Sequence, residues 1–319
     1  MSALIETQGL KKYFKTSRGM VHAVDNVTIS IPEGKTLGVV GESGCGKSTL
    51  GRTLVRLYEP TEGKILYEGH DISHIKANSP VFRNNMQMIF QDPYSSLNPR
   101  MTVSQLIAEP LKVTKMIRDP RERDRRVFEL MNIVGLAPSL VNAYPHELDG
   151  GRRQRIGVAR ALALNPKFIV CDEPVSALDV SIQAQILNLL MDLQDNLGLT
   201  YMFITHNLAV VKHISDEIVV MYLGQCVEQT TSGELFKNPM HPYTQALLKA
   251  IPIAKTGQKR LYSDVIQGEL TSPIDPKPGC RFAPRCPYAC AECTEKDAEL
   301  KEITPGHRVA CIMVQEGKI

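Results

Sequence analysis

Short apolar runs bounded by turn residues predict the buried strands of this chain. Three of them, residues 37–40, 168–171 and 201–205, are rich in β-branched or aromatic side chains. After the second run, apolar residues recur at helical spacing, at Ile182, Ile186, Leu189, Leu193 and Leu197. A helix with this pattern packs one face onto a sheet. Buried strands that alternate with helices indicate a parallel sheet of the α/β class.

The flanking regions show other patterns. Residues 4–31 read as short strands and turns, and residues 63–67 alternate as a half-exposed strand does. Residues 85–90 look like another strand, which ends at Gln91. From about residue 100 to residue 163 the pattern is mostly helical, and proline at positions 99, 110, 120, 138 and 145 divides it into pieces. We therefore expect a helical region over about residues 96–163.

Composition limits the class of protein. The chain has 319 residues, 43% of them hydrophobic, which suits one large domain and a smaller appendage. A formal net charge of +3 is too small to indicate a nucleic-acid partner. No apolar run approaches the roughly 18 to 20 residues that span a bilayer, and the first residues lack a secretory signal. Because residues 252–279 are rich in Pro and Gly, we predict one domain over residues 1–251 and a second over 252–319.

The candidate chemistry begins directly after the first apolar run. The segment there comprises Gly41, Glu42, Ser43, Gly44, Cys45, Gly46, Lys47, Ser48 and Thr49. A G-x-x-x-x-G-K-S pattern between a strand and a helix is a phosphate-binding loop (P-loop), whose backbone N–H groups face the phosphates. Lys47 would neutralise the β- and γ-phosphates, and the Ser48 hydroxyl would bind Mg²⁺. The chain is therefore expected to bind a nucleotide.

Further motifs follow the P-loop in a specific order. Residues 148–155 read L-D-G-G-R-R-Q-R and precede an alanine-rich helix. The sites of interest after the P-loop are, in order, Gln91, the 148–152 segment, Asp172, Glu173, the S-A-L-D segment (Ser176, Ala177, Leu178 and Asp179) and His206. This order over residues 4–250 resembles the ATP-binding subunits of ABC transporters. The resemblance implies a P-loop (RecA-like) parallel sheet core with an antiparallel β subdomain, a helical subdomain and a small Cys-rich C-terminal appendage.

ATP hydrolysis needs a metal, a group that orients water, and charge stabilisation at the γ-phosphate. Asp172 ends an apolar run, so its carboxylate would emerge at the edge of the sheet and face Mg²⁺ together with Ser48. By resemblance, Glu173 polarises the attacking water and His206 contacts the γ-phosphate. Gln91, again by resemblance, touches Mg²⁺ and water and links the core to the helical part.

Two further assignments complete the expected ATP site. Adenine stacks on aromatic rings, and of the adjacent Tyr13 and Phe14 the family's spacing favours Phe14. The S-A-L-D segment ending at Asp179 would lie at the seam between two such subunits, where it shapes the partner's site.

The signature segment departs from the family pattern. The family reads L-S-G-G-Q and grips the γ-phosphate bound to the opposite subunit, whereas this chain has Leu148, Asp149, Gly150, Gly151 and Arg152. A carboxylate near a phosphate is unfavourable by about 3 to 4 kcal/mol per charge pair at an effective dielectric of about 20. Arg152 could offset part of this. We expect an impaired partner site and hence a heterodimer of two different ATPase chains; tolerance of Asp149 through local rearrangement stays open.

Three further segments indicate which group of ABC transporters the chain resembles. Residues 91–100, 238–248 and 268–273 resemble the ATPase subunits of oligopeptide and dipeptide importers. This implies two transmembrane permease subunits, an extracytoplasmic peptide-binding protein, and a peripheral location on the cytoplasmic face of the membrane. An importer of nickel or another small solute, or a soluble ABC ATPase, remain alternatives. A single P-loop and the absence of heptads argue against the soluble class.

Five of the eight cysteines lie near the C-terminus. Such clustering in a reducing compartment favours a metal site over disulfides. The spacing of Cys280, Cys286, Cys293 and Cys311 resembles the iron–sulfur pattern of some peptide-importer ATPases. We therefore predict a [4Fe-4S] cluster, with structural zinc or free thiols as the alternatives, and with Cys290 outside the spacing.

Overall fold

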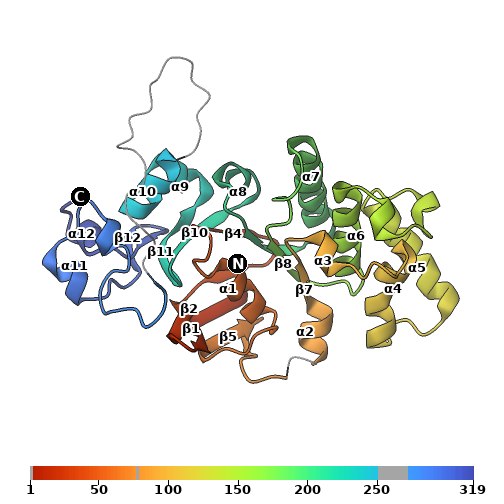
Figure 1. Cartoon of the computed structure of the whole chain (residues 1–319), viewed down its shortest axis with the longest axis horizontal. Helices are drawn as coiled ribbons and strands as arrows, with labels where there is room; N and C mark the ends of the chain where they lie inside the picture. The colour runs from red at the N-terminus through yellow and green to blue at the C-terminus, as the bar shows by residue number, and fades with distance from the viewer. Residues whose placement is uncertain (1–2, 77–78, 251–271) are drawn as a thin grey trace, which may run out of the picture.

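The computed structural model describes residues 3–76, 79–250 and 272–319. Figure 1 shows an elongated molecule with a central sheet, a smaller sheet below it, helices at the right-hand end and the C-terminal residues at the left. Within the described residues, no helix is both long and apolar enough to cross a membrane.

The smaller sheet is antiparallel and runs β2-β1-β5-β6, with β3 paired to β1. Its strands are β1 (Ala3–Thr16), β2 (Gly19–Val27), β3 (Ser30–Pro32), β5 (Glu62–Tyr67) and β6 (His70–Asp71). Most of residues 4–31 thus form one long hairpin rather than several short strands. The register of β1 on β2 shifts between Leu10 and Tyr13. This irregularity breaks the two-residue period by which a long strand is recognised.

The central sheet has the strand order β12-β13-β11-β10-β4-β9-β8-β7. Its parallel strands are β4 (Thr36–Val40), β7 (Met86–Ile89), β8 (Phe168–Asp172), β9 (Thr200–Ile204) and β10 (Glu217–Tyr222). Strands β4, β8 and β9 are buried throughout, as the three apolar runs predicted. Because parallel strands end at one edge of a sheet, the loops after them converge there.

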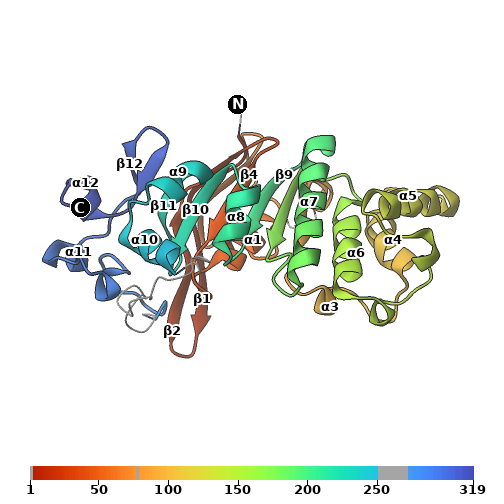
Figure 2. The same cartoon turned by 90° about the horizontal axis from the view of Figure 1, so that it is seen from above.

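Helices cover the central sheet on both sides, as Figure 2 shows from above. They are α1 (Lys47–Leu54), α7 (Val180–Leu197), α8 (Leu208–Ile214), α9 (Ser232–Lys237) and α10 (Pro242–Lys249). Helix α1 lies between the two sheets, and its Leu50 and Leu54 join Leu10 and Val170 in one apolar core. Of the apolar positions predicted for α7, Ile186 and Leu193 are buried, Ile182 and Leu189 are half-buried, and Leu197 is 52% exposed at the end of the helix. The helix also buries Leu187 and Leu190, which the predicted pattern did not include.

A helical region extends from the β7 edge of the sheet. The short helix α2 (Pro80–Asn85) precedes β7, and its Phe82 packs in the same core as α1. The helical region itself comprises α3 (Pro93–Ser96), α4 (Val103–Thr114), α5 (Pro120–Ile133), η1 (Pro138–Leu140), η2 (Pro145–Glu147) and α6 (Gly150–Leu162). Proline is the first residue of α2, α3, α5, η1 and η2, where its missing N–H costs no helical hydrogen bond. Leu106, Leu130 and Ile156 from α4, α5 and α6 meet in a second apolar core, which continues onto the central sheet.

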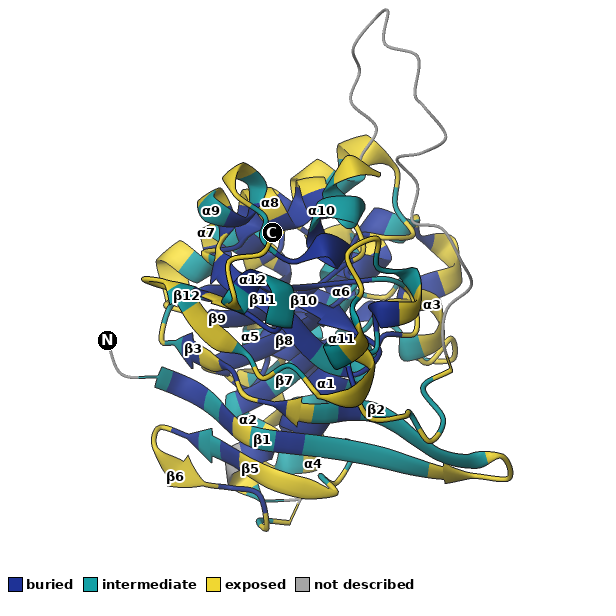
Figure 3. Cartoon of the chain, turned by 90° about the vertical axis from the view of Figure 1, so that its left-hand side faces the viewer, coloured by how far each residue is buried: buried dark blue, intermediate teal, exposed yellow. Residues whose placement is uncertain are grey.

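The C-terminal residues attach to the opposite edge of the sheet. They form η4 (Ala283–Arg285), α11 (Ala291–Glu295), β12 (Lys301–Thr304), β13 (His307–Val309) and α12 (Ile312–Gln315). Strand β13 pairs with β11 (Gln225–Thr231), and the buried His307 Nε2 lies 2.7 Å from Glu228 Oε1. Figure 3 shows buried strands behind this partly exposed end. The domain boundary predicted at residues 251/252 lies outside the described residues and stays a prediction.

Candidate ATP site

The P-loop joins β4 to α1 and holds its own lysine. Lys47 begins α1, is buried, and donates hydrogen bonds from Nζ to the carbonyls of Gly41 (2.8 Å) and Glu42 (2.9 Å). Gly46 precedes it with φ of 104°. A Cβ atom there would lie 2.0 Å from the Ala23 carbonyl oxygen, so only glycine fits this close approach to β2.

Asp172 lies at the end of β8, beside the start of α1. The Ser48 hydroxyl donates a hydrogen bond of 2.6 Å to Asp172 Oδ1. The other carboxylate oxygen, Oδ2, is buried without a hydrogen bond and lies 3.5 Å from Arg52 Nη2. Burial raises the pKa of Asp172, while the hydrogen bond from Ser48 acts in the opposite direction. A buried carboxylate oxygen beside a hydroxyl fits Mg²⁺, which takes few protein ligands and completes its shell with water and phosphate oxygens.

Glu173 follows Asp172 directly and faces a different pair of side chains. Gln91 Nε2 donates a hydrogen bond of 3.0 Å to Glu173 Oε2, and His206 Nδ1 lies 3.2 Å from Oε1. The three residues follow β7, β8 and β9 respectively. The shared edge of the parallel strands thus brings together residues that are far apart in the sequence.

The P-loop opens into a cavity of about 360 Å³. Phe14 lines it, together with Gln91, Glu173 and the P-loop residues 43, 44 and 46–49. Tyr13, by contrast, stacks on His22 with ring centroids 3.9 Å apart and donates a hydrogen bond to Asp25. The rest of the wall was not expected from the sequence and consists of Val21, His22, Ala23, Leu223, Gly224 and Pro273. No local motif marks these residues, because they meet only through the pairing of distant segments.

The signature segment forms the start of α6, in the helical region. Asp149 is the N-cap of α6 and accepts a hydrogen bond of 2.8 Å from the Arg152 N–H. Arg152 Nη1 also lies 2.7 Å from Asp149 Oδ2, so the two departures from the family pattern form an exposed ion pair. A Cβ atom at Gly150 would lie 3.0 Å from Leu178, which shows that the S-A-L-D segment packs against the signature. Asp179 caps α7 by accepting from the Ile182 N–H at 2.9 Å.

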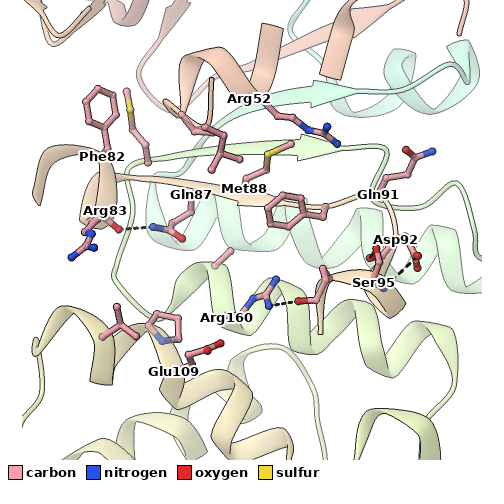
Figure 4. Close-up of a pocket in the computed structure, with 18 residues that line it drawn as sticks. Arg52, Phe82, Arg83, Gln87, Met88, Gln91, Asp92, Ser95, Glu109 and Arg160 are labelled. Carbon is pink, nitrogen blue, oxygen red and sulfur yellow. Dashed lines mark hydrogen bonds between the residues drawn. The ribbon is translucent and has the colours of Figure 1, made fainter. Parts of the chain in front are cut away.

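A larger cavity of about 750 Å³ lies beside Gln91, between the core and the helical region. Figure 4 shows Arg83, Gln87 and Met88 on the core side, with Glu109 and Arg160 on the helical side. Arg160 donates a hydrogen bond of 2.6 Å to the Ser96 carbonyl, which ties α6 to α3. Ser95 and Asp92, at the start of α3, lie at the end nearest Gln91.

Comparison with known proteins places these features in a family. The profile of the ABC transporter family matches residues 24–176. The oligopeptide transport ATP-binding protein AppF of Bacillus subtilis (strain 168) is 52% identical over 97% of this chain and 96% of that protein. The chain belongs to the ABC transporter family. It is accordingly an ATP-binding protein with ATP-hydrolysing machinery.

A second relative, a solved structure and a second family profile are also similar to this ABC transporter protein. The dipeptide transport ATP-binding protein DppF of Haemophilus influenzae is 47% identical over 98% of this chain and 97% of that protein. A dimeric ATP-binding cassette in a post-hydrolysis state, bound to ADP and phosphate, aligns with a TM-score of 0.65 at 28% identity. That alignment covers 72% of this chain and 98% of the other. The profile of the oligopeptide/dipeptide transporter C-terminal region matches residues 227–293.

The predicted iron–sulfur cluster is wrong. Within the part of the chain that the structure describes, no group of three or more His, Cys, Asp or Glu side chains is placed to hold a metal ion. AppF and DppF are described as transport ATP-binding proteins, not as iron–sulfur proteins. All eight cysteines are free thiols.

Packing explains why the cysteine spacing was misleading. Cys280, Cys286, Cys293 and Cys311 line one small cavity of about 10 Å³, which is at the lower limit for a single water molecule. Burial raises the pKa of all four thiols, that of Cys280 to about 11. The sulfur atoms of Cys290 and Cys293 lie 3.4 Å apart, and Cys290 is the cysteine outside the predicted set.

Proposed function

We propose that the chain is the ATP-hydrolysing subunit of an ABC importer that takes up oligopeptides or dipeptides. The observation that carries the proposal is the single cavity onto which the P-loop, Gln91 and Glu173 open. The match of residues 227–293 to the peptide-transporter C-terminal region supports peptides as the solute class. The names of the relatives point to the same class of solute rather than to nickel.

The arrangement of side chains supports a division of roles at the ATP site. Phe14 would stack on adenine, and the P-loop amides with Lys47 would hold the phosphates. Mg²⁺, held by Ser48, Asp172 and Gln91, would supply charge neutralisation at the β- and γ-phosphates. Glu173, oriented by the Gln91 hydrogen bond, would polarise the water, and His206 on its other oxygen would contact the γ-phosphate.

We further propose that two ATPase chains close around two ATP molecules and that the pair is a heterodimer. The signature of this chain would face its partner's ATP, where Asp149 brings a negative charge. The ion pair with Arg152 offsets part of that charge, but it is exposed and therefore weak. The partner's site would then be the weaker one, and the site built on Lys47 and Glu173 the stronger.

The cavity beside Gln91 supports a site of contact with the membrane-spanning permeases. It lies between the core and the helical region, so a change in their relative position would change the shape of this cavity. Gln91 also lines the ATP cavity and bonds Glu173, which connects the two places. We accordingly propose a peripheral position on the cytoplasmic face of the membrane, with two permeases and an extracytoplasmic peptide-binding protein in the complex.

The proposal is tested by the Lys47→Ala variant of the complete importer. Reconstituted complexes would be assayed for peptide uptake and for peptide-stimulated ATP turnover. We expect both to fall at least about 100-fold, because the phosphates lose their charge partner. Arg308→Gln, an exposed change on β13, is the control and keeps both activities. Uptake that persists in the Lys47→Ala complex would contradict the proposal.

A further inference from the structure

The C-terminal residues reach the P-loop at a place that none of the sequence motifs includes. Arg285, the last residue of η4, donates hydrogen bonds from Nη1 to Glu42 Oε2 (2.9 Å) and from Nη2 to Glu42 Oε1 (3.2 Å). The Arg285 side chain is only 6% exposed. A two-pronged contact between a planar guanidinium and a carboxylate fixes orientation as well as distance. Glu42 is therefore held by a residue 243 positions further along the chain.

Glu42 is held from two further directions. Its N–H donates a hydrogen bond of 2.9 Å to the Tyr243 hydroxyl, and its carbonyl accepts one of 2.9 Å from Lys47 Nζ. Tyr243 is fully buried against Tyr222 and Phe282, so its hydroxyl has little freedom to move. Because Lys47 Nζ is hydrogen-bonded to the Glu42 carbonyl, the position of Glu42 also determines where the Lys47 ammonium lies before ATP binds.

A second C-terminal segment forms part of the wall of the ATP cavity. The Pro273 carbonyl accepts a hydrogen bond of 3.0 Å from the His22 N–H, and the Asp275 N–H donates one of 2.9 Å to the Met20 carbonyl. This places the segment along β2, and Pro273 lines the cavity together with Phe14. Residues 272–319 thus contact the ATP site on two sides, through Arg285 and through Pro273.

We propose that Arg285 is a positioning residue for ATP: it holds the P-loop through Glu42 and neutralises a carboxylate that belongs to that loop. The inference rests on the proposed ATP site and gives the C-terminal region a part in it. Glu42 itself does not line the ATP cavity, but its chain neighbour Ser43 does. Without Arg285, the P-loop would therefore carry an unpaired negative charge next to the phosphate site, which disfavours phosphate binding. ATP carries one more negative charge than ADP, so its binding is weakened more.

The test is a double-mutant cycle on the full-length chain. Dissociation constants for ATP and ADP are measured by titration calorimetry for the wild type, Arg285→Gln, Glu42→Gln and the double variant. We expect Arg285→Gln to weaken ATP binding about tenfold and ADP binding less. On the Glu42→Gln background the same change has less than about a twofold effect, because no carboxylate is left unpaired. In the assembled complex, KM for ATP rises while kcat stays within about twofold.

Controls separate positioning from general damage. Arg308→Gln removes an exposed arginine of the same region and keeps the affinity for ATP. Arg285→Lys keeps the positive charge, so it loses less affinity for ATP than Arg285→Gln does. It replaces Arg285→Gln in the cycle if that variant does not fold. Unchanged ATP affinity in the Arg285 variants, or the same loss on both backgrounds, overturns the inference. Lys47→Ala in the same assay tests the ATP site itself: normal ATP binding by that variant would reject the site, whatever Arg285 does.

Discussion

At the scale of single residues, the end of β8 places two neighbouring carboxylates in two environments. Asp172 is fully buried beside Ser48, whereas Glu173 meets Gln91 and His206 at the rim of the cavity. The Glu173 backbone has φ of 47°, a left-handed conformation that residues other than glycine rarely adopt. Its N–H is fixed by the Ile204 carbonyl at 2.9 Å. This turn directs the two adjacent carboxylates into different surroundings, as the proposed separate roles at Mg²⁺ and at the attacking water require.

Replacing Glu173 tests this division of roles and the proposed asymmetry together. Glu173→Gln keeps the size of the side chain but removes the base, so ATP turnover of the assembled pair should fall at least about 100-fold. ATP binding should persist, because the P-loop is untouched. The equivalent change in the partner chain should have a much smaller effect on turnover. Equal losses from the two changes would reject a pair with one strong and one weak site.

Contiguous motifs made much of the candidate site predictable, because a P-loop is specified by neighbouring residues. Gln91, Asp172, Glu173 and His206, which were expected near it, do share one edge of the central sheet. The rest of the cavity wall was not predictable. Gly224 and Pro273 reach it only because the β10–β11 turn and a C-terminal segment pack beside β2. The cysteine spacing was misleading since sequence distance carries no information about the space between side chains.

At the scale of elements, helix α6 shows how one residue can serve stability and chemistry at once. Its first turn carries two glycines, which are poor helix formers, and no acidic residue. Asp149 compensates as N-cap, by bonding the Arg152 N–H and placing a negative charge at the positive end of the helix. The residue that departs from the family pattern is therefore also the one that begins the helix.

Substitution of Asp149 should test its role as the N-cap of α6. Asp149→Ala should lower the free energy of unfolding by about 0.5 to 2 kcal/mol, because the helix loses its cap. Asp149→Ser, the matched control, keeps a capping oxygen and should change stability by only a few tenths of a kcal/mol. Urea unfolding of the two variants measures the difference. Equal stability of the Ala and Ser variants would show that the cap contributes nothing.

Elements differed in how readily the sequence predicted them. Strands β4, β8 and β9 are buried on both faces, so each is an unbroken apolar run. The β1–β2 hairpin was mistaken for short strands because its register shifts interrupt the alternation. Helix α2 was missed: its short sequence of residues 80–85 has no helical period, and Pro80 at its start was not interpreted as a first-turn residue.

At the scale of the whole molecule, one buried carboxylate joins the C-terminal end to the core. Glu228 is fully buried and accepts hydrogen bonds from the N–H groups of Met240 (2.8 Å) and His241 (3.0 Å). His307, from β13, is its third partner at 2.7 Å. His241 is itself buried, and its Nδ1 accepts a hydrogen bond of 3.0 Å from the Tyr243 N–H. Burial lowers the pKa of His241 to about 4, against the opposing effect of Glu228.

The buried His241 makes stability depend on pH. In the unfolded chain His241 binds a proton below its ordinary pKa of about 6.5, whereas in the folded chain it does so only near its lowered pKa of about 4. The free energy of unfolding therefore falls as the pH is lowered from about 6.5 to about 4. The loss attributable to His241 is at most about 3 kcal/mol. His241→Asn, whose amide oxygen can accept from Tyr243, should flatten the slope measured by urea unfolding at successive pH values. An unchanged slope in that variant would contradict the assignment.

The way β13 joins β11 has a consequence for shortened versions of the chain. Glu228 and Gln229 of β11 pair with β13, so the hairpin covers the border of the central sheet. A chain cut before that hairpin would present unpaired peptide groups along β11, a strand that is largely buried in the intact chain, and such edges pair with strands of other molecules. The first symptom of truncation should therefore be aggregation during expression. Poor yield of a shortened chain would then reflect self-association and would not show that the chain fails to bind ATP.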